Sequence, residues 1–174
     1  EDVSQCFFEQ LFVENQMGCE NPHDRLAPSL STTIIHSHVK DGIEMARQHK
    51  LPEVIIDFIA EHHGTSLVRY FYHQASNSGE TVFEDDFRYP GPKPQSRETA
   101  ILLLCDGVEA AARTMSSPTS EKLTELVNKM VQDHLDEGQL DESDLSLKDI
   151  QLIKESLSNS LRGIYHARIE YPEA

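Results

Sequence analysis

Apolar residues recur at helical spacing along much of the chain. In the first such stretch, Leu30, Ile34, Ile35, Ile43 and Ala46 mark one side of a helix that ends near Leu51. Ser29 is the expected N-cap of this helix. The sequence contains no convincing alternation of apolar and polar residues, which half-buried strands would require. The predicted fold class is therefore all-α.

A second helix is expected over the short, strongly apolar stretch from Glu53 to Glu61. Pro52 suits the first turn of this helix, because its missing N–H has no partner there anyway. The helix runs directly into His62-His63. After a break at Gly64, the residues from Leu67 to Tyr72 indicate another helical segment.

The second half of the chain predicts three longer helices. They are expected from about Arg97 to Arg113, from about Ser120 to Leu135, and from Ser146 onward, where Ser146 and Asp149 resemble a capping box. The chain is expected to turn at Gly138. Residues 76–96 form a loop rich in Ser, Gly, Asp, Glu and Pro, and a loop of this length is usually functional or disordered.

Composition narrows the function. The chain has 174 residues, which suits one domain, and it carries 15 Lys plus Arg against 30 Asp plus Glu. A nucleic-acid polymer is therefore an unsuitable partner, because backbone binding depends on basic side chains. No apolar run approaches the roughly 18 residues that a membrane span needs. Three cysteines without Cys-x-x-Cys spacing favour a reducing, cytoplasmic setting, and nine histidines favour nitrogen and oxygen ligands for any metal.

Helical phase brings a few polar side chains to the apolar faces. His38 shares the inward face of the first helix with Ile34 and Ile35, whereas His36 is turned well away from Ile34. His62 follows Ile55, Phe58 and Ile59 on one face, and His63 follows Ile59 and Ala60. Asp106 follows Leu102 and Leu103 and is expected to face the interior. A lone charge in an apolar core is costly, so Asp106 needs a partner.

Two interpretations of these four residues stay open at this point. One is an ordinary buried cluster of Asp and His joined by hydrogen bonds. The other is a metal centre, because mixed His and Asp ligands suit manganese, iron or zinc, and two such ions can activate a hydroxide for attack on phosphorus.

Seven short segments give the chain a family resemblance. In this order it resembles the cytoplasmic HD domain of bacterial seven-transmembrane receptors with an intracellular HD hydrolase, over nearly its whole length. The segments are Phe12-Val13-Glu14-Asn15-Gln16, Asn21-Pro22-His23-Asp24, Ser37-His38-Val39-Lys40-Asp41-Gly42, His62-His63-Gly64-Thr65, Tyr70-Phe71-Tyr72, Tyr89-x-Gly91-Pro92-Lys93-Pro94 and Asp106-x-Val108-Glu109-Ala110-Ala111.

The resemblance implies an HD-domain helical bundle that opens cyclic di-AMP to pApA with two divalent ions, manganese or iron. By motif, the implied metal ligands are His38, His62, His63 and Asp106, and the last three are the implied catalytic residues. Lys93 is the candidate phosphate contact and Tyr89 the candidate adenine neighbour. Residues 1–174 are expected to form a single HD-type phosphohydrolase domain that is truncated at its N-terminus.

The chain departs from the family pattern at its start. The family carries a His-Asp-x-Gly-Lys run upstream of Phe12, and Glu1-Asp2-Val3-Ser4-Gln5 stands at that distance here. Asp2 is the candidate for the shared carboxylate ligand. Three explanations of this departure compete. The sequence starts inside the domain, its upstream part has been removed, or the first motif has been lost naturally.

Two other functions remain beside the phosphodiesterase. The first is a catalytically silent helical signalling module that binds a nucleotide or a partner domain, and the second is an HD hydrolase with another phosphate ester as substrate. The resemblance further implies a cytoplasmic domain of a bacterial inner-membrane protein, joined to the membrane only through parts outside this chain. A homodimer is left open.

Overall fold

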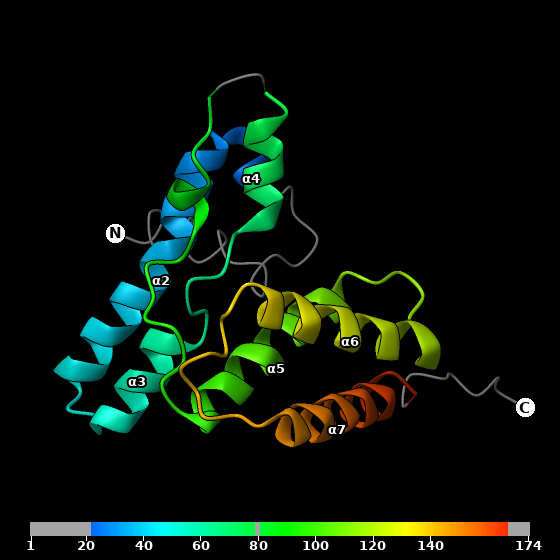
Figure 1. Ribbon diagram of the computed structural model, residues 1–174. Helices are drawn as coiled ribbons and strands as arrows, with labels where there is room; N and C mark the ends of the chain where they lie inside the picture. Colours follow the sequence, from blue (N-terminus) through cyan, green and yellow to red (C-terminus); the bar gives the residue numbers. More distant parts are fainter. Residues whose placement is uncertain (1–21, 79–80, 167–174) are drawn as a thin grey trace, which may run out of the picture. The chain divides into compact units, whose positions relative to one another are not determined.

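The computed structural model describes residues 22–78 and 81–166, and these residues confirm the predicted all-α class (Figure 1). They form six α-helices, α2 to α7, and two short 3-10 helices, η2 and η3. The described residues contain no named strand, and extended pairing within them is limited to one isolated bridge, between Leu67 and Arg88.

The described residues divide into two compact units. Residues 22–59, 65–78 and 81–90 belong to the first unit, and residues 60–64 and 91–166 belong to the second. Helix α3 (Glu53–Glu61) contributes most of its length to the first unit and its last two residues to the second.

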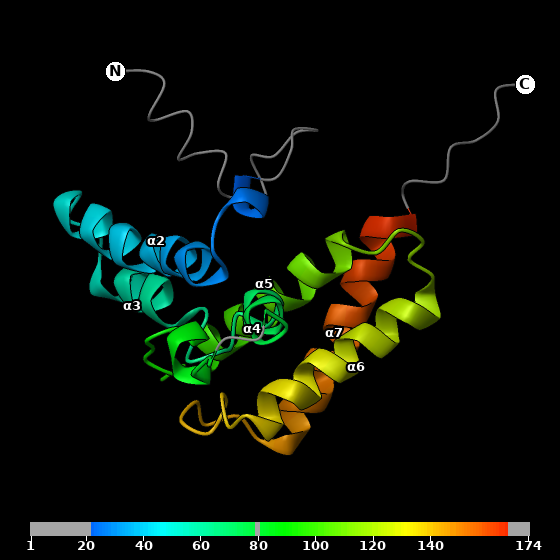
Figure 2. The same ribbon diagram turned by 90° about the horizontal axis from the view of Figure 1, so that it is seen from above.

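The second unit is built from α5 (Arg97–Arg113), α6 (Ser120–Asp136) and α7 (Leu147–His166). The three helices pack against one another, and Figure 2 shows α6 and α7 side by side. Their apolar faces bury one continuous core. Its buried members are Ala100, Leu103, Leu104, Val108, Ala112, Leu123, Val127, Val131, Leu140, Ile150 and Leu161.

Local sequence explains where these three helices begin. Ser96 caps α5 by accepting the backbone N–H of Thr99, and Thr119 caps α6 by accepting the N–H of Lys122. At α7, Ser146 and Asp149 exchange the hydrogen bonds of a capping box, as predicted. The predicted turn at Gly138 is also confirmed, because this residue has φ +63°.

The described residues of the first unit form a smaller buried cluster. Helix α2 (Pro28–Gln48) packs against α4 (Arg69–Ser76), and both contact η3 (Glu84–Phe87), which lies in the long loop. The buried cluster here consists of Phe71, Ala75 and Phe87. The ring of His23, from η2 (Pro22–Arg25), packs on Phe71 at a centroid distance of 5.3 Å.

Three predicted helix starts in the first unit were wrong in detail. Helix α2 begins at Pro28 after Ala27, with no side-chain cap, so Ser29 lies inside the helix. Pro52 precedes α3 and its carbonyl accepts the N–H of Ile55. Residues 67 and 68 are not helical: Leu67 pairs with Arg88, which delays the start of α4 to Arg69.

The predicted apolar face also needs correction at two positions. Leu30 is 48% exposed and Ile55 is 41% exposed, whereas Ile56 is buried. Periodicity located the helices, but it misjudged which apolar residues point inward. Within the described part of the chain, no helix combines the length and the apolar character that crossing a membrane requires.

Candidate metal centre

His62 and His63 lie in a tight turn directly after α3. The turn closes when the Gly64 N–H donates to the carbonyl of Glu61 at 2.9 Å. Gly64 has φ +54°, and a Cβ at this position would lie 2.6 Å from Oε1 of Gln139. Only glycine fits both the backbone conformation and the space.

Two contacts within the second unit define how the histidine rings lie. The rings of His62 and His63 have centroids 3.9 Å apart. Nδ1 of His63 lies 3.5 Å from Oδ2 of Asp106, which comes from the middle of α5. The imidazole and the carboxylate, far apart in sequence, therefore face each other.

The predicted interior position of Asp106 was wrong. Its side chain is 44% exposed, so the carboxylate lies at the edge of the core rather than inside it. Its neighbour Cys105 is half-buried, and burial, helped by the charge of Asp106, raises the pKa of the Cys105 thiol. The raised pKa keeps the Cys105 thiol in its protonated form at neutral pH.

His38 lies on α2 and has a defined tautomer. Its Nδ1 is within hydrogen-bond distance of the carbonyl of Ile35, and a carbonyl can only accept, so Nδ1 carries the proton. The lone pair is then on Nε2, the atom available to a metal. The His38 ring meets the edge of the Tyr89 ring at a centroid distance of 6.2 Å.

His36 lies on the same helix as His38 and packs on Tyr89 at a centroid distance of 4.6 Å. Burial, with the nearby His38 as a second cause, lowers the pKa of His36. A neutral His36 is therefore an aromatic neighbour of Tyr89, and it is not one of the three histidines whose ring nitrogens lie close together.

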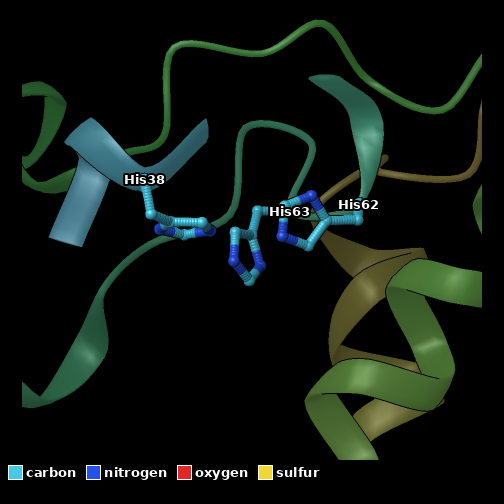
Figure 3. Close-up of side chains that lie close together, drawn as sticks. All are labelled: His38, His62 and His63. Carbon is cyan, nitrogen blue, oxygen red and sulfur yellow. The ribbon is translucent and has the colours of Figure 1, made fainter. Parts of the chain in front are cut away.

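The three histidines His38, His62 and His63 each offer one ring nitrogen, and these atoms lie within 4.8 Å of one another (Figure 3). Such a histidine cluster can bind a metal ion, since imidazole nitrogen suits borderline divalent cations. All three side chains are half-buried, which limits competition from bulk water. The donor set thus fits a divalent metal. Asp2 lies outside the described residues, so the structure gives no position for this predicted ligand.

The two predicted substrate contacts are Lys93 and Tyr89, and neither side chain is fully exposed. Lys93 is half-buried, and its Nζ lies 3.6 Å from the point that a Cβ at Gly138 would occupy. Tyr89 is half-buried, and its N–H donates to the carbonyl of Ser66 at 3.0 Å. Their roles as substrate contacts remain predictions.

Sequence reasoning passed over Glu61, the last residue of α3. Its side chain is only 5% exposed, and Oε2 accepts hydrogen bonds from Thr99 and from the backbone of Gln95. The sequence feature that could have pointed to Glu61 is its position between an apolar helix and the histidine pair.

Comparisons with known proteins identify the family of this chain. A family model described as "HD domain" matches residues 12–111. The cyclic-di-AMP phosphodiesterase PgpH of Bacillus subtilis is 49% identical over 165 residues, which are 95% of this chain and 23% of that protein. The PgpH of Listeria monocytogenes is 44% identical over 172 residues, 99% of this chain and 24% of that protein. The chain thus spans about a quarter of the length of these curated relatives.

A solved structure supports the same assignment. The crystal structure of the L. monocytogenes phosphodiesterase PgpH HD domain in complex with cyclic-di-AMP matches with a TM-score of 0.85 and 45% sequence identity. The match covers 93% of this chain and 75% of that one. Fold and sequence agree, and the chain belongs to the HD domain family.

Proposed function

We propose that this chain is a metal-dependent phosphodiesterase that hydrolyses cyclic di-AMP to pApA. The observation that carries the proposal is the group of three imidazole nitrogens within 4.8 Å of one another, in a chain of the HD domain family. The choice of substrate is supported by the 45% identical HD domain whose crystal structure is a complex with cyclic-di-AMP.

The proposed cofactor is a pair of divalent ions, manganese or iron. His38, His62, His63 and Asp106 would hold them, with Asp2 as a shared carboxylate. When bound, such ions supply the Lewis acidity that activates the attacking water and offsets the charge developing on the phosphate.

The described residues would prepare this site in two ways. The carbonyl of Ile35 fixes the protonated nitrogen of His38, which leaves Nε2 as the donor atom. Asp106, at 3.5 Å, would orient the His63 ring and favour its binding to a cation. Both contacts would place a lone pair before any ion binds, which would lower the cost of ordering the ligands.

Lys93 and Tyr89 are the proposed substrate contacts. The ammonium group of Lys93 would act as a point charge on a phosphate, and the Tyr89 ring would lie beside an adenine. The chain has a formal net charge of −15, so its overall field repels a dinucleotide. Attraction of the substrate must therefore come from local groups such as Lys93 and from the ions.

The longer relatives suggest the setting of this domain. From the family resemblance we propose that it is a cytoplasmic domain of a bacterial inner-membrane protein, and this chain spans about a quarter of each PgpH relative. A homodimer is part of this proposal, and sedimentation of the full chain tests it.

The direct test is turnover. The full chain is loaded with manganese, and cyclic di-AMP and cyclic di-GMP are followed by chromatography beside His62→Ala and Asp106→Ala. We expect pApA from cyclic di-AMP and a loss of at least about 100-fold in both variants, because each removes a ligand. His49→Ala is the matched control, since His49 is exposed and lies outside the cluster.

Two results would contradict this proposal. Full activity of His62→Ala and Asp106→Ala would mean that the ligand set is wrong. Tight binding of cyclic di-AMP by the manganese-loaded wild-type chain without any turnover would instead support the catalytically silent module.

A further inference from the structure

Glu61 has an unusual environment for a carboxylate. Among the residues that the structure describes, it is the one acidic side chain in the buried class, with 5% exposure. Burying a charge is costly unless hydrogen bonds or an opposite charge compensate. No Lys or Arg side chain of the described residues forms an ion pair with Glu61, so its hydrogen bonds must provide the compensation.

Two donors converge on one oxygen of Glu61. The Thr99 hydroxyl donates to Oε2 at 2.6 Å, and the backbone N–H of Gln95 donates to the same atom at 2.8 Å. Both distances are typical of hydrogen bonds to a charged acceptor. Thr99 lies in the first turn of α5, where the helix dipole also stabilises a negative charge.

These bonds tie three pieces of the second unit together. Glu61 is bonded to His62 in the chain, and its own carbonyl closes the turn through the N–H of Gly64. Gln95, held by Glu61, uses its side chain to donate to the carbonyl of Lys93 and to Glu142. The histidine turn, the start of α5 and the Lys93 loop therefore share one buried acceptor.

We infer that Glu61 is a positioning residue that holds the His62-His63 turn and the Lys93 loop in register for metal and substrate. Glu61 itself contacts neither the metal nor the substrate. The inference rests on the proposed function of the His62-His63 turn and of Lys93. Groups that orient metal ligands typically change metal affinity or activity 10- to 100-fold when they are replaced.

The test compares Glu61→Ala and Glu61→Gln in the full chain, with Asp57→Ala as the control. Asp57 lies on the same helix and is exposed, so its replacement removes an equal charge without a buried partner. The first readout is Mn²⁺ affinity, measured by competition with a chelator on protein shown to be folded by circular dichroism. The second is hydrogen exchange at the amides of Gln95 and Gly64 in the metal-free chain.

We expect Glu61→Ala to weaken Mn²⁺ binding by about tenfold or more and to speed exchange at Gln95 and Gly64 by a similar factor. Glu61→Gln keeps one acceptor oxygen and should fall between Glu61→Ala and wild type. Asp57→Ala should match wild type. If Glu61→Ala does not fold, Thr99→Val carries the test, because it removes the hydroxyl that donates to Glu61 at nearly constant volume, together with the part of that hydroxyl in the α5 capping box. Thr99→Ser is the conservative variant that should restore both bonds.

Two results would overturn the inference: wild-type Mn²⁺ affinity and exchange in a folded Glu61→Ala, or exchange that rises equally throughout α5, α6 and α7. The second would mean that Glu61 only stabilises the unit. If the wild-type chain neither binds Mn²⁺ nor cleaves cyclic di-AMP, the proposed function fails. Exchange at Gln95 and Gly64 in the metal-free chain still decides whether Glu61 holds the turn and the loop.

Discussion

Among the described residues, the two compact units differ in the size of their buried apolar clusters. The second unit has eleven buried residues in one core between three long helices, whereas the described cluster of the first unit has three. The first unit also leaves apolar side chains such as Val54 and Ile55 exposed on α3. Local stability follows buried contacts, so the second unit should be the more rigid support.

This difference separates the candidate ligands. The His62-His63 turn and Asp106 belong to the second unit, where Gly64 and Glu61 are fixed by buried neighbours. His38 belongs to the first unit, where its Nδ1 bonds the carbonyl of Ile35 in the same helix and its ring meets Tyr89. We therefore expect substitutions near the histidine turn to act through packing, and substitutions near His38 to act locally.

The largest expected effect comes from the core of the second unit. Leu104 is fully buried on α5, and Leu104→Ala should lower the free energy of unfolding by about 3–5 kcal/mol through lost contacts and a cavity. Ile35→Ala, at a half-buried position beside the smaller cluster, should cost about 1–2 kcal/mol. Denaturant unfolding measures both values. Equal costs would remove the contrast between the two units.

The turn itself gives the next effect. Gly64→Ala should cost about 2–3 kcal/mol, because alanine resists the positive φ and its Cβ would meet Gln139. Gly163→Ala is the matched control in α7: nothing lies within 4 Å of its Cβ, so alanine should stabilise the helix by about 0.5–1 kcal/mol. Thermal unfolding should thus shift in opposite directions. A shift in the same direction would contradict the steric argument.

Helix caps provide a smaller contrast between the units. Ser96→Ala removes a capping box and should lower the free energy of unfolding by about 1 kcal/mol. Ser29→Ala should change it by less than about 0.5 kcal/mol, because Ser29 is exposed inside α2 and caps nothing. Urea midpoints distinguish the two, and a loss in Ser29→Ala as large as in Ser96→Ala would restore Ser29 as the cap.

The smallest effect concerns pH. Hydrogen bonds from the side chain and then the backbone N–H of Ser146 lower the pKa of Asp149 below its usual range. The resulting stability is present above the pKa of the unfolded state, about 4, and is lost as the pH falls through the lower folded value. Asp149→Asn should therefore lower the melting temperature at pH 7, and its difference from wild type should shrink toward pH 2. Asp57→Asn, at an exposed position of α3, is the control. If its difference in melting temperature from wild type depended on pH in the same way, the pH dependence could not be assigned to the Asp149 carboxylate.

Sequence periodicity and capping chemistry predicted the second unit closely. The bounds of α5 were predicted as they are observed, and the start of α7 followed from Ser146 and Asp149, because local signals and the core agree there. In the first unit, Pro28 at the first helical position displaced the predicted cap at Ser29. Pairing between Leu67 and Arg88, distant in sequence, delayed α4.

The candidate site was predictable in part. Helical phase and family motifs selected His38, His62 and His63, which the structure groups. Phase could not tell that Asp106 lies at the edge of the core, since exposure there depends on which helices pack on α5. The burial of Glu61 was also hidden, because its donors Gln95 and Thr99 are more than thirty residues away.

The bond between Glu61 and Thr99 has an evolutionary consequence. Thr99 serves both as the donor to Glu61 and as the third residue of the α5 capping box. In a relative with an apolar residue in place of Glu61, a hydroxyl at position 99 would serve only to cap α5. In a relative that kept Glu61 but lost this hydroxyl, the buried carboxylate would lack one of its hydrogen-bond donors. Positions 61 and 99 should therefore vary together among related proteins, with the loss of the carboxylate preceding the loss of the hydroxyl.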